Sequence, residues 1–223
     1  MNIVMVLSGG SGLRFGGSVP KQYMQLCGSD VVSYPVNAAK RSKKCAHIIV
    51  AAHDPYMEYI REKYKVECCR GGNTHSETVY HALTFVKKNY PNCSNILFAD
   101  SVRPFLTADI IDEYFTKLKD ADAVITAQHI TDSLGKKGVQ FVDRSSYYLI
   151  QKPEAFRFDL LYKVFDCRSE KTAIVQQLPP EAKIELYYGM QHNLKITYPE
   201  DLHLAEVMVS QNKKYIKPQG GLL

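Results

Sequence analysis

The chain has 223 residues, a formal net charge of +5 at pH 7 and 45% hydrophobic residues. This length suits one α/β domain with a substantial core and is short for two, so we expect a single domain over residues 1–223. The sequence has no apolar run long enough to span a membrane and no basic block typical of nucleic-acid binding, so the charge is better matched to small phosphorylated ligands.

Short apolar or β-branched runs predict the strands of this domain. They cover residues 3–7, 47–52, 95–99, 123–127 and 184–188. Before the first run stand only Met1 and Asn2, without the basic start and the cleavage site of a secretory signal. We therefore expect a cytoplasmic protein.

Amphipathic segments between these runs predict helices. Apolar residues recur at helical spacing over residues 76–90, at Val79, Ala82, Leu83 and Val86. Capping signals predict further helices over 56–65, over 108–119 behind Thr107, and from about Thr197 onward. Alternating strands and helices predict an α/β, Rossmann-like, doubly wound and mainly parallel sheet, with its ligand site beyond the carboxyl ends of the strands.

Residues 130–151 interrupt the alternation of strands and helices. The stretch is polar, contains Gly135 and Gly138, and ends in two short apolar runs around Val142 and residues 147–150. This pattern predicts a protruding β-arm. Such an arm is either a simple excursion from the domain or a cover for the site of a neighbouring subunit.

A glycine-rich turn follows the first predicted strand. It has the sequence Leu7, Ser8, Gly9, Gly10, Ser11, Gly12. Glycines let backbone N–H groups come close to phosphates, and the spacing fits neither a Walker loop nor the dinucleotide-binding pattern. Arg14 and Lys21 bracket the turn, and fixed cations of this kind stabilise the charge that builds up on departing pyrophosphate. They are the leading candidates for catalytic residues.

Two more charged residues stand next to predicted elements. Asp100 directly follows the strand over 95–99, where a carboxylate can hold Mg²⁺ against a triphosphate. The plainer alternative makes Asp100 a helix cap or a partner of Arg103. Lys195 precedes the last predicted helix, whose N-terminal N–H groups favour phosphate, although a lone lysine there is usually solvated.

The order of these motifs resembles the cytidylyltransferases for methylerythritol phosphate and ribitol 5-phosphate. The likeness begins with the Gly-Gly-Ser-Gly-Leu-Arg turn and Pro20-Lys21-Gln22, and it extends over almost the whole chain. The later motifs are Gly71-Gly72, Asp100-Ser101-Val102-Arg103-Pro104-Phe105, Thr131-Asp132-Ser133, Val142-Asp143-Arg144 and Asn193-Leu194-Lys195-Ile196-Thr197.

The resemblance implies a Mg²⁺-dependent reaction of CTP with a small phosphorylated polyol that releases pyrophosphate. It implies that Asp100 holds the metal beside the substrate, that Lys195 joins Arg14 and Lys21 in catalysis by contacting the CTP phosphates, and that Ser133 and Arg144 grip the substrate phosphate. In that arrangement the arm reaches across the interface of a homodimer. The implied nucleotide-binding residues are Leu7, Ser8, Gly9, Gly10, Ser11, Gly12, Gly72 and Ser76.

Several positions depart from the family's pattern. His75 replaces an arginine, Ala99 a frequent histidine and Lys152-Pro153-Glu154 the sequence Thr-Pro-Gln, and the segment 171–173 lacks the usual acids. These differences favour ribitol 5-phosphate, or another polyol phosphate of teichoic acid or capsule synthesis. The alternatives are the methylerythritol phosphate enzyme of isoprenoid biosynthesis, an inactive nucleotide-binding scaffold, and a sugar-1-phosphate nucleotidyltransferase that uses another nucleotide.

Overall fold

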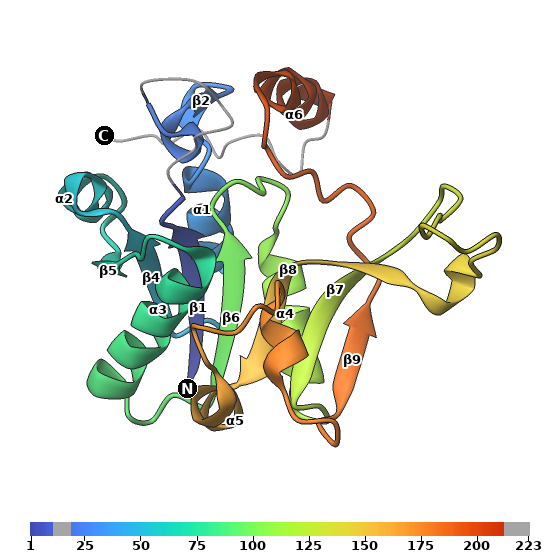
Figure 1. The fold of residues 1–223 in the computed structure, drawn as a ribbon. Helices are drawn as coiled ribbons and strands as arrows, with labels where there is room; N and C mark the ends of the chain where they lie inside the picture. The colour runs from blue at the N-terminus through green and yellow to red at the C-terminus, as the bar shows by residue number, and fades with distance from the viewer. Residues whose placement is uncertain (11–18, 212–223) are drawn as a thin grey trace.

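A computed structural model describes residues 1–10 and 19–211 (Figure 1). Within this part of the chain the central sheet has seven strands in the order β5-β4-β1-β6-β8-β7-β9. The strands are β1 (Asn2–Ser8), β4 (His47–Ala52), β5 (Glu67–Arg70), β6 (Asn95–Asp100), β7 (Ala123–His129), β8 (Tyr148–Arg157) and β9 (Ile184–Tyr187). Only β8 among these seven runs antiparallel to its neighbours, so the predicted mainly parallel α/β sheet is confirmed.

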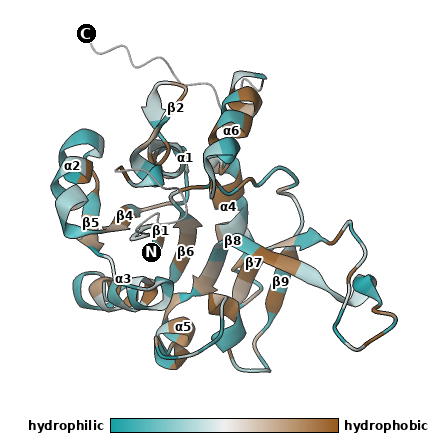
Figure 2. Ribbon diagram, turned by 45° about the horizontal axis from the view of Figure 1, so that its top comes forward, coloured by the Kyte–Doolittle hydropathy of each residue, from teal (hydrophilic) through white to brown (hydrophobic). Residues whose placement is uncertain are grey.

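Helices cover both faces of the sheet because its central strands are apolar on both sides. The helices are α1 (Ser33–Arg41), α2 (Asp54–Tyr64), α3 (His75–Asn89), α4 (Ala108–Lys117), α5 (Phe158–Val164) and α6 (Pro199–Gln211). Val4 and Val6 of β1 pack with α1, α2 and α4, whereas Ile3 and Met5 pack with α3 and α5. Figure 2 shows the resulting hydrophobic strands between more hydrophilic helices. None of the described helices is both long and apolar enough to cross a membrane.

The sequence located most of these elements but missed two strands of the sheet. All five predicted runs are strands, and the helix predicted over 76–90 is α3. Thr107 caps α4 as expected, because its hydroxyl accepts a hydrogen bond from the Ile110 N–H at 3.4 Å. β5 is short, and β8 carries Lys152, Pro153 and Glu154 where a strand is normally apolar or alternating. Neither strand therefore shows the apolar run or the alternation of apolar and polar residues that predicts a strand.

The expected arm extends the hairpin formed by β7 and β8. The two strands pair up to His129 and Tyr148, and the residues between them, 130–147, project beyond the sheet (Figure 1). The arm includes a 3-10 helix, η3 (Arg144–Ser146), and an isolated bridge between Lys136 and Val139.

A β-bulge interrupts the pairing of β7 with β8 next to β6. Ile125 pairs with Glu154, but the following Thr126 pairs with Gln151, so two residues of β8 have no partner in β7. The Thr126 hydroxyl donates to the Pro153 carbonyl at 2.8 Å, and the Tyr114 hydroxyl lies 2.7 Å from the same Thr126 oxygen. Bulges commonly redirect side chains beside functional sites.

A small hairpin of β2 (Gln25–Leu26) and β3 (Ser29–Asp30) is fixed to α2 by one buried carboxylate. Asp30 accepts hydrogen bonds from the hydroxyls of Tyr59 and Tyr64, both at 2.5 Å, and from the Lys63 ammonium at 2.9 Å. Burial alone would raise the pKa of Asp30, but these donors outweigh it and hold that pKa below its usual value of 3.8.

Replacing Asp30 by asparagine is expected to lower the free energy of unfolding at neutral pH by about 2 kcal/mol, because charged hydrogen bonds are lost in the core. A lowered folded-state pKa stabilises the protein above the unfolded pKa, and this contribution disappears as the pH falls through the folded pKa. Urea unfolding of both proteins should therefore show a difference that is largest near neutral pH and shrinks below about pH 4. A constant difference across that range would contradict the assignment.

Candidate active site

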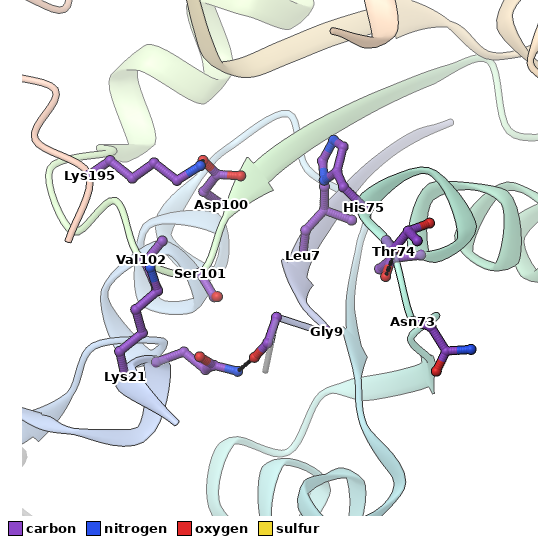
Figure 3. Close-up of a pocket in the computed structure, with 13 residues that line it drawn as sticks. Leu7, Gly9, Lys21, Asn73, Thr74, His75, Asp100, Ser101, Val102 and Lys195 are labelled. Carbon is purple, nitrogen blue, oxygen red and sulfur yellow. Dashed lines mark hydrogen bonds and ion pairs between the residues drawn. The ribbon is translucent and has the colours of Figure 1, made fainter. Parts of the chain in front are cut away.

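A cavity of about 420 Å³ opens where β1 and β6 end at the same edge of the sheet. Five segments line it: the turn after β1, the 3-10 helix η2 (Lys21–Tyr23), the start of α3, the end of β6 and the segment before α6. Figure 3 shows Lys21 and Lys195 on one side of this cavity, with Thr74 and His75 on the other. The site thus lies beyond the carboxyl ends of the strands, as the sequence predicted.

The glycine turn forms one wall of the cavity. Leu7, Gly9 and Gly10 line it, and a Cβ at Gly9 would lie only 2.8 Å from the Thr78 hydroxyl, so this close approach requires glycine. Ser8 is buried and does not line the cavity. Its hydroxyl lies 3.2 Å from the Tyr23 hydroxyl. The predicted Ser11, Gly12 and Arg14 lie outside the described residues.

Lys21 lines the cavity at the start of η2, and its neighbours attach this segment to the glycine turn. The buried Gln22 amide donates to the carbonyls of Ser8 at 3.0 Å and Gly10 at 2.9 Å. The Tyr23 ring stacks on Tyr56 of α2 at 4.1 Å between centroids. The sequence singled out Lys21 but gave no role to Gln22, although the two are adjacent.

Replacing Gln22 by methionine keeps a similar volume but removes both hydrogen bonds to the turn. We expect an apparent KM for the ligand that binds at this turn to be about tenfold higher, since about 1.4 kcal/mol of preorganisation is lost. Steady-state kinetics should show a smaller change in kcat than in KM. Gln176→Met serves as a control, because that side chain contacts Ala173 outside the cavity. An unchanged KM would contradict the anchoring role of Gln22.

The start of α3 forms the opposite wall of the cavity. Thr74 caps the helix by accepting a hydrogen bond from the Glu77 N–H at 3.1 Å. A Cβ at Gly72 would lie 2.3 Å from the Glu77 Cβ, so only glycine allows the chain to turn so closely into the helix. A helix N-terminus attracts anions through its unpaired N–H groups and its dipole.

The lining residues of this wall differ from those predicted. Asn73, Thr74 and His75 line the cavity, whereas the predicted Gly72 and Ser76 do not. Gly72 is buried and its N–H donates to the Thr78 hydroxyl at 3.0 Å. The cavity is therefore lined here by the cap Thr74, the residue on each side of it and Thr78, and not by the two positions chosen from the sequence.

Asp100, at the end of β6, lies among cations that include Lys195. Its Oδ2 is 3.1 Å from the Arg103 Nε and 3.6 Å from the Lys195 Nζ. Burial would raise the pKa of Asp100, but Lys195, Arg103 and Lys152 together lower it to about 2. The structure therefore brings Asp100 and Lys195 together as predicted, and the ion pair with Arg103 exists as well.

Ser133 and Arg144 lie in the arm and do not line this cavity in the same chain. Both are exposed, and the Arg144 guanidinium donates a hydrogen bond to the Thr131 carbonyl. The arm projects from the opposite half of the sheet from the glycine turn (Figure 1). One chain alone therefore does not bring these two residues to Lys21 and Asp100.

The side chains that line this cavity suit a metal ion that is held mainly by the oxygens of a bound phosphorylated ligand. The described residues contain no group of three or more His, Cys, Asp or Glu side chains arranged to hold a metal. Asp100 contributes one carboxylate to the lining. Mg²⁺ commonly uses one or two carboxylates together with phosphate oxygens and water, so this residue fits such an ion.

The cavity combines features that favour a polyphosphate ligand. It offers a close-packed glycine turn, the N-terminus of α3, and the cations Lys21 and Lys195 around one ionised carboxylate, Asp100. Fixed cations and N–H dipoles in a partly enclosed site stabilise charge that develops during phosphoryl or nucleotidyl transfer. The sequence did not assign Lys152 and Asn193 to the site. Lys152 interacts electrostatically with Asp100, and Asn193 contacts both Lys152 and Arg103.

Comparison with known proteins gives a consistent family. A family model described as IspD, 2-C-methyl-D-erythritol 4-phosphate cytidylyltransferase, matches residues 2–211. A protein of that name from Thermotoga neapolitana is 30% identical, with 95% of this chain and 98% of the relative covered. One from Azobacteroides pseudotrichonymphae is also 30% identical, with 92% of this chain and 97% of the relative covered.

Solved structures show the same fold at lower sequence identity. The 4-diphosphocytidyl-2C-methyl-D-erythritol synthase from Anaerococcus prevotii superposes with a TM-score of 0.80 at 24% identity, covering 94% of this chain and 98% of that one. The 2-C-methyl-D-erythritol 4-phosphate cytidylyltransferase from Thermus thermophilus superposes with a TM-score of 0.74 at 21% identity, covering 93% of this chain and 98% of that one. The ribitol 5-phosphate branch favoured by the sequence is not supported, because these relatives carry the methylerythritol name.

Proposed function

The chain belongs to the IspD family of cytidylyltransferases and is a nucleotidyltransferase that uses CTP, and we propose that its acceptor is 2-C-methyl-D-erythritol 4-phosphate. The observation that supports nucleotidyl transfer is the cavity that Lys21, Asp100 and Lys195 share beside the glycine turn. The product would be a CDP-linked polyol, as an intermediate of isoprenoid biosynthesis. Teichoic acid and capsule roles are not supported, because the relatives named above carry the methylerythritol name.

The proposed reaction is an in-line substitution. A phosphate oxygen of the acceptor forms a bond to the α-phosphorus of CTP, and the bond from that phosphorus to the β-phosphate oxygen breaks. Pyrophosphate leaves with the electron pair, and no proton transfer is needed because the attacking oxygen is already ionised. Lys21 and Lys195 stabilise the charge on the phosphates, and the sequence assigns Arg14 to the same task.

Asp100 is proposed to hold the divalent metal, for which Mg²⁺ is the best chemical match. When bound, the ion would neutralise part of the triphosphate charge. The Asp100 carboxylate is ionised at any physiological pH, since its pKa is about 2. It is therefore ready to accept a cation without first losing a proton.

The choice of acceptor rests on the names of the relatives and is tested by a substrate panel. Pyrophosphate release should be measured with each of the four nucleotides, combined with methylerythritol phosphate, ribitol 5-phosphate or a sugar 1-phosphate. We expect turnover with CTP and methylerythritol phosphate. Preferred turnover of ribitol 5-phosphate would overturn the proposal for the acceptor, and CTP binding by calorimetry without any product would favour a scaffold.

A homodimer is proposed because the arm exposes apolar side chains and carries its candidate substrate residues away from its own cavity. In the arm Phe141 is 79% exposed and Tyr147 is 52% exposed, and Leu149 at the start of β8 is 50% exposed. A second copy that packs on the arm would bury these residues and could bring Arg144 and Ser133 to the partner's cavity. Light scattering tests the dimer. Partial recovery of activity on mixing Lys21→Ala with Arg144→Ala chains would identify a shared site.

A further inference from the structure

A buried pair of opposite charges on β8 lies directly behind the cavity. Lys152 is 7% exposed and Glu154 is 1% exposed, and the Lys152 ammonium contacts the Glu154 carboxylate. The other oxygen of Glu154 accepts a hydrogen bond from the Val175 N–H at 3.2 Å, in the 3-10 helix η4 (Ile174–Gln177). Buried ion pairs often contribute little net stability over apolar residues, so this pair calls for another explanation.

The strand register brings Lys152 next to Asp100. β6 and β8 are antiparallel, with Phe98 opposite Glu154. Asp100 is two residues after Phe98, and Lys152 is two residues before Glu154, so both reach the carboxyl end of β6 together. Each of the two also acts electrostatically on the other: Asp100 raises the pKa of Lys152, although burial, the largest influence, brings that pKa down to about 7.

Asn193 connects the backbone of Lys152 to the cations around Asp100. Its side-chain amide donates to the Lys152 backbone carbonyl at 2.7 Å, and the backbone carbonyl of Asn193 accepts from the Arg103 guanidinium at 2.5 Å. Arg103 in turn contacts Asp100, and Lys195 lies two residues after Asn193. One network therefore joins η4, β8, the end of β6 and the segment that carries Lys195.

We propose that Lys152 and Glu154 are a positioning pair that holds Asp100 and Lys195 in place for the metal-bound nucleotide. The proposal rests on the proposed function of this cavity. Lys152 balances Asp100 from the buried side when Lys195 turns to the phosphates of the ligand. Glu154 retains the Lys152 ammonium, which would otherwise pair with Asp100 and compete with the metal for that carboxylate.

Calorimetry of CTP binding in the presence of Mg²⁺ tests this pair without any acceptor. We expect Glu154→Gln to weaken binding of Mg·CTP by roughly tenfold or more, as is usual when the residues supporting a metal ligand are altered. CTP binding without Mg²⁺ should change much less. The double variant Lys152→Thr/Glu154→Gln has no ammonium to compete with the metal, so it should bind Mg·CTP more tightly than Glu154→Gln, but it should stay weaker than the wild type because Asp100 also loses the balancing charge. Lys152→Arg should retain the affinity.

A matched control comes from Lys117 and Glu185, an ion pair of 2.5 Å that joins α4 to β9 away from the cavity. The variant Lys117→Thr/Glu185→Gln should leave the Mg²⁺-dependent part of CTP binding unchanged. If Glu154→Gln lowers only the melting temperature and leaves that part intact, the pair is structural and the proposal is wrong.

The same measurements separate this proposal from the proposed function. A wild-type chain that binds Mg·CTP but makes no product with methylerythritol phosphate would contradict the acceptor assignment alone. The comparison of Glu154→Gln with the double variant would still decide the role of the pair. A wild-type chain that binds no Mg·CTP would contradict both.

Discussion

Replacing Lys21 by alanine is expected to lower kcat by about 10²- to 10³-fold, the usual cost of removing a fixed group that stabilises developing charge. Lys21 lines the cavity from η2, which is held to the glycine turn through Gln22. The turn and the helix do not depend on the lysine ammonium for these hydrogen bonds. The variant should therefore fold normally while pyrophosphate release nearly stops.

The control for this prediction is Lys119→Ala, an exposed lysine beyond the end of α4. Circular dichroism and thermal unfolding should be similar for the wild type and both variants. Pyrophosphate release close to the wild-type rate in Lys21→Ala would show that the cavity is not where the transfer takes place.

The second large effect is expected for Asp100→Asn, which keeps the size of the side chain but removes its charge. The substitution leaves Arg103, Lys195 and Lys152 without their common carboxylate and removes the candidate metal ligand. We expect activity to fall on the order of 100-fold or more, with a higher Mg²⁺ concentration needed for half-maximal rate. Rates at a series of Mg²⁺ concentrations measure both effects.

The pH dependence gives this prediction a further check. The pKa of Asp100 is lowered to about 2, so its charge contributes to stability above the unfolded pKa near 3.8, and the contribution is lost as the pH falls through the folded pKa. The titration of Asp100 itself should therefore not change the defect of Asp100→Asn between about pH 6 and 9, whereas Lys152, whose pKa is about 7, titrates beside it in that range. Asp159→Asn, at an exposed surface pair with Lys87, is the control. A defect that disappears at the acid end of this range would mean that Asp100 is already protonated there and would contradict the assignment.

The main residues of the candidate site were predictable because of where they stand relative to the strands. The turn after β1 and Asp100 at the end of β6 come from neighbouring parallel strands, and such strands end at one edge of the sheet. Lys21 and Lys195 were found from the motifs around them. Lys21 follows the turn after β1, and both lysines line the cavity at the edge where β1 and β6 end.

The supporting network was not predictable in the same way. Lys152 and Glu154 were noticed only as departures from a family pattern, and their meaning depends on the antiparallel pairing of β8 with β6. Nothing in the local sequence fixes that pairing, because β8 lies far along the chain from β6 and lacks strand periodicity. Asn193 likewise acts through contacts with residues 41 to 90 positions away.

The bulge of β8 has a consequence for how the arm can vary. A strand that slips by one residue turns every side chain to the opposite face. The hydrogen bond from Thr126 to the Pro153 carbonyl fixes the register of β8 between the arm and the cavity. Lys152 and Glu154 therefore keep the same orientation whatever the length of the arm. Insertions or deletions within residues 130–147 therefore leave Lys152 and Glu154 behind the cavity in place, and they alter only what the arm itself contacts.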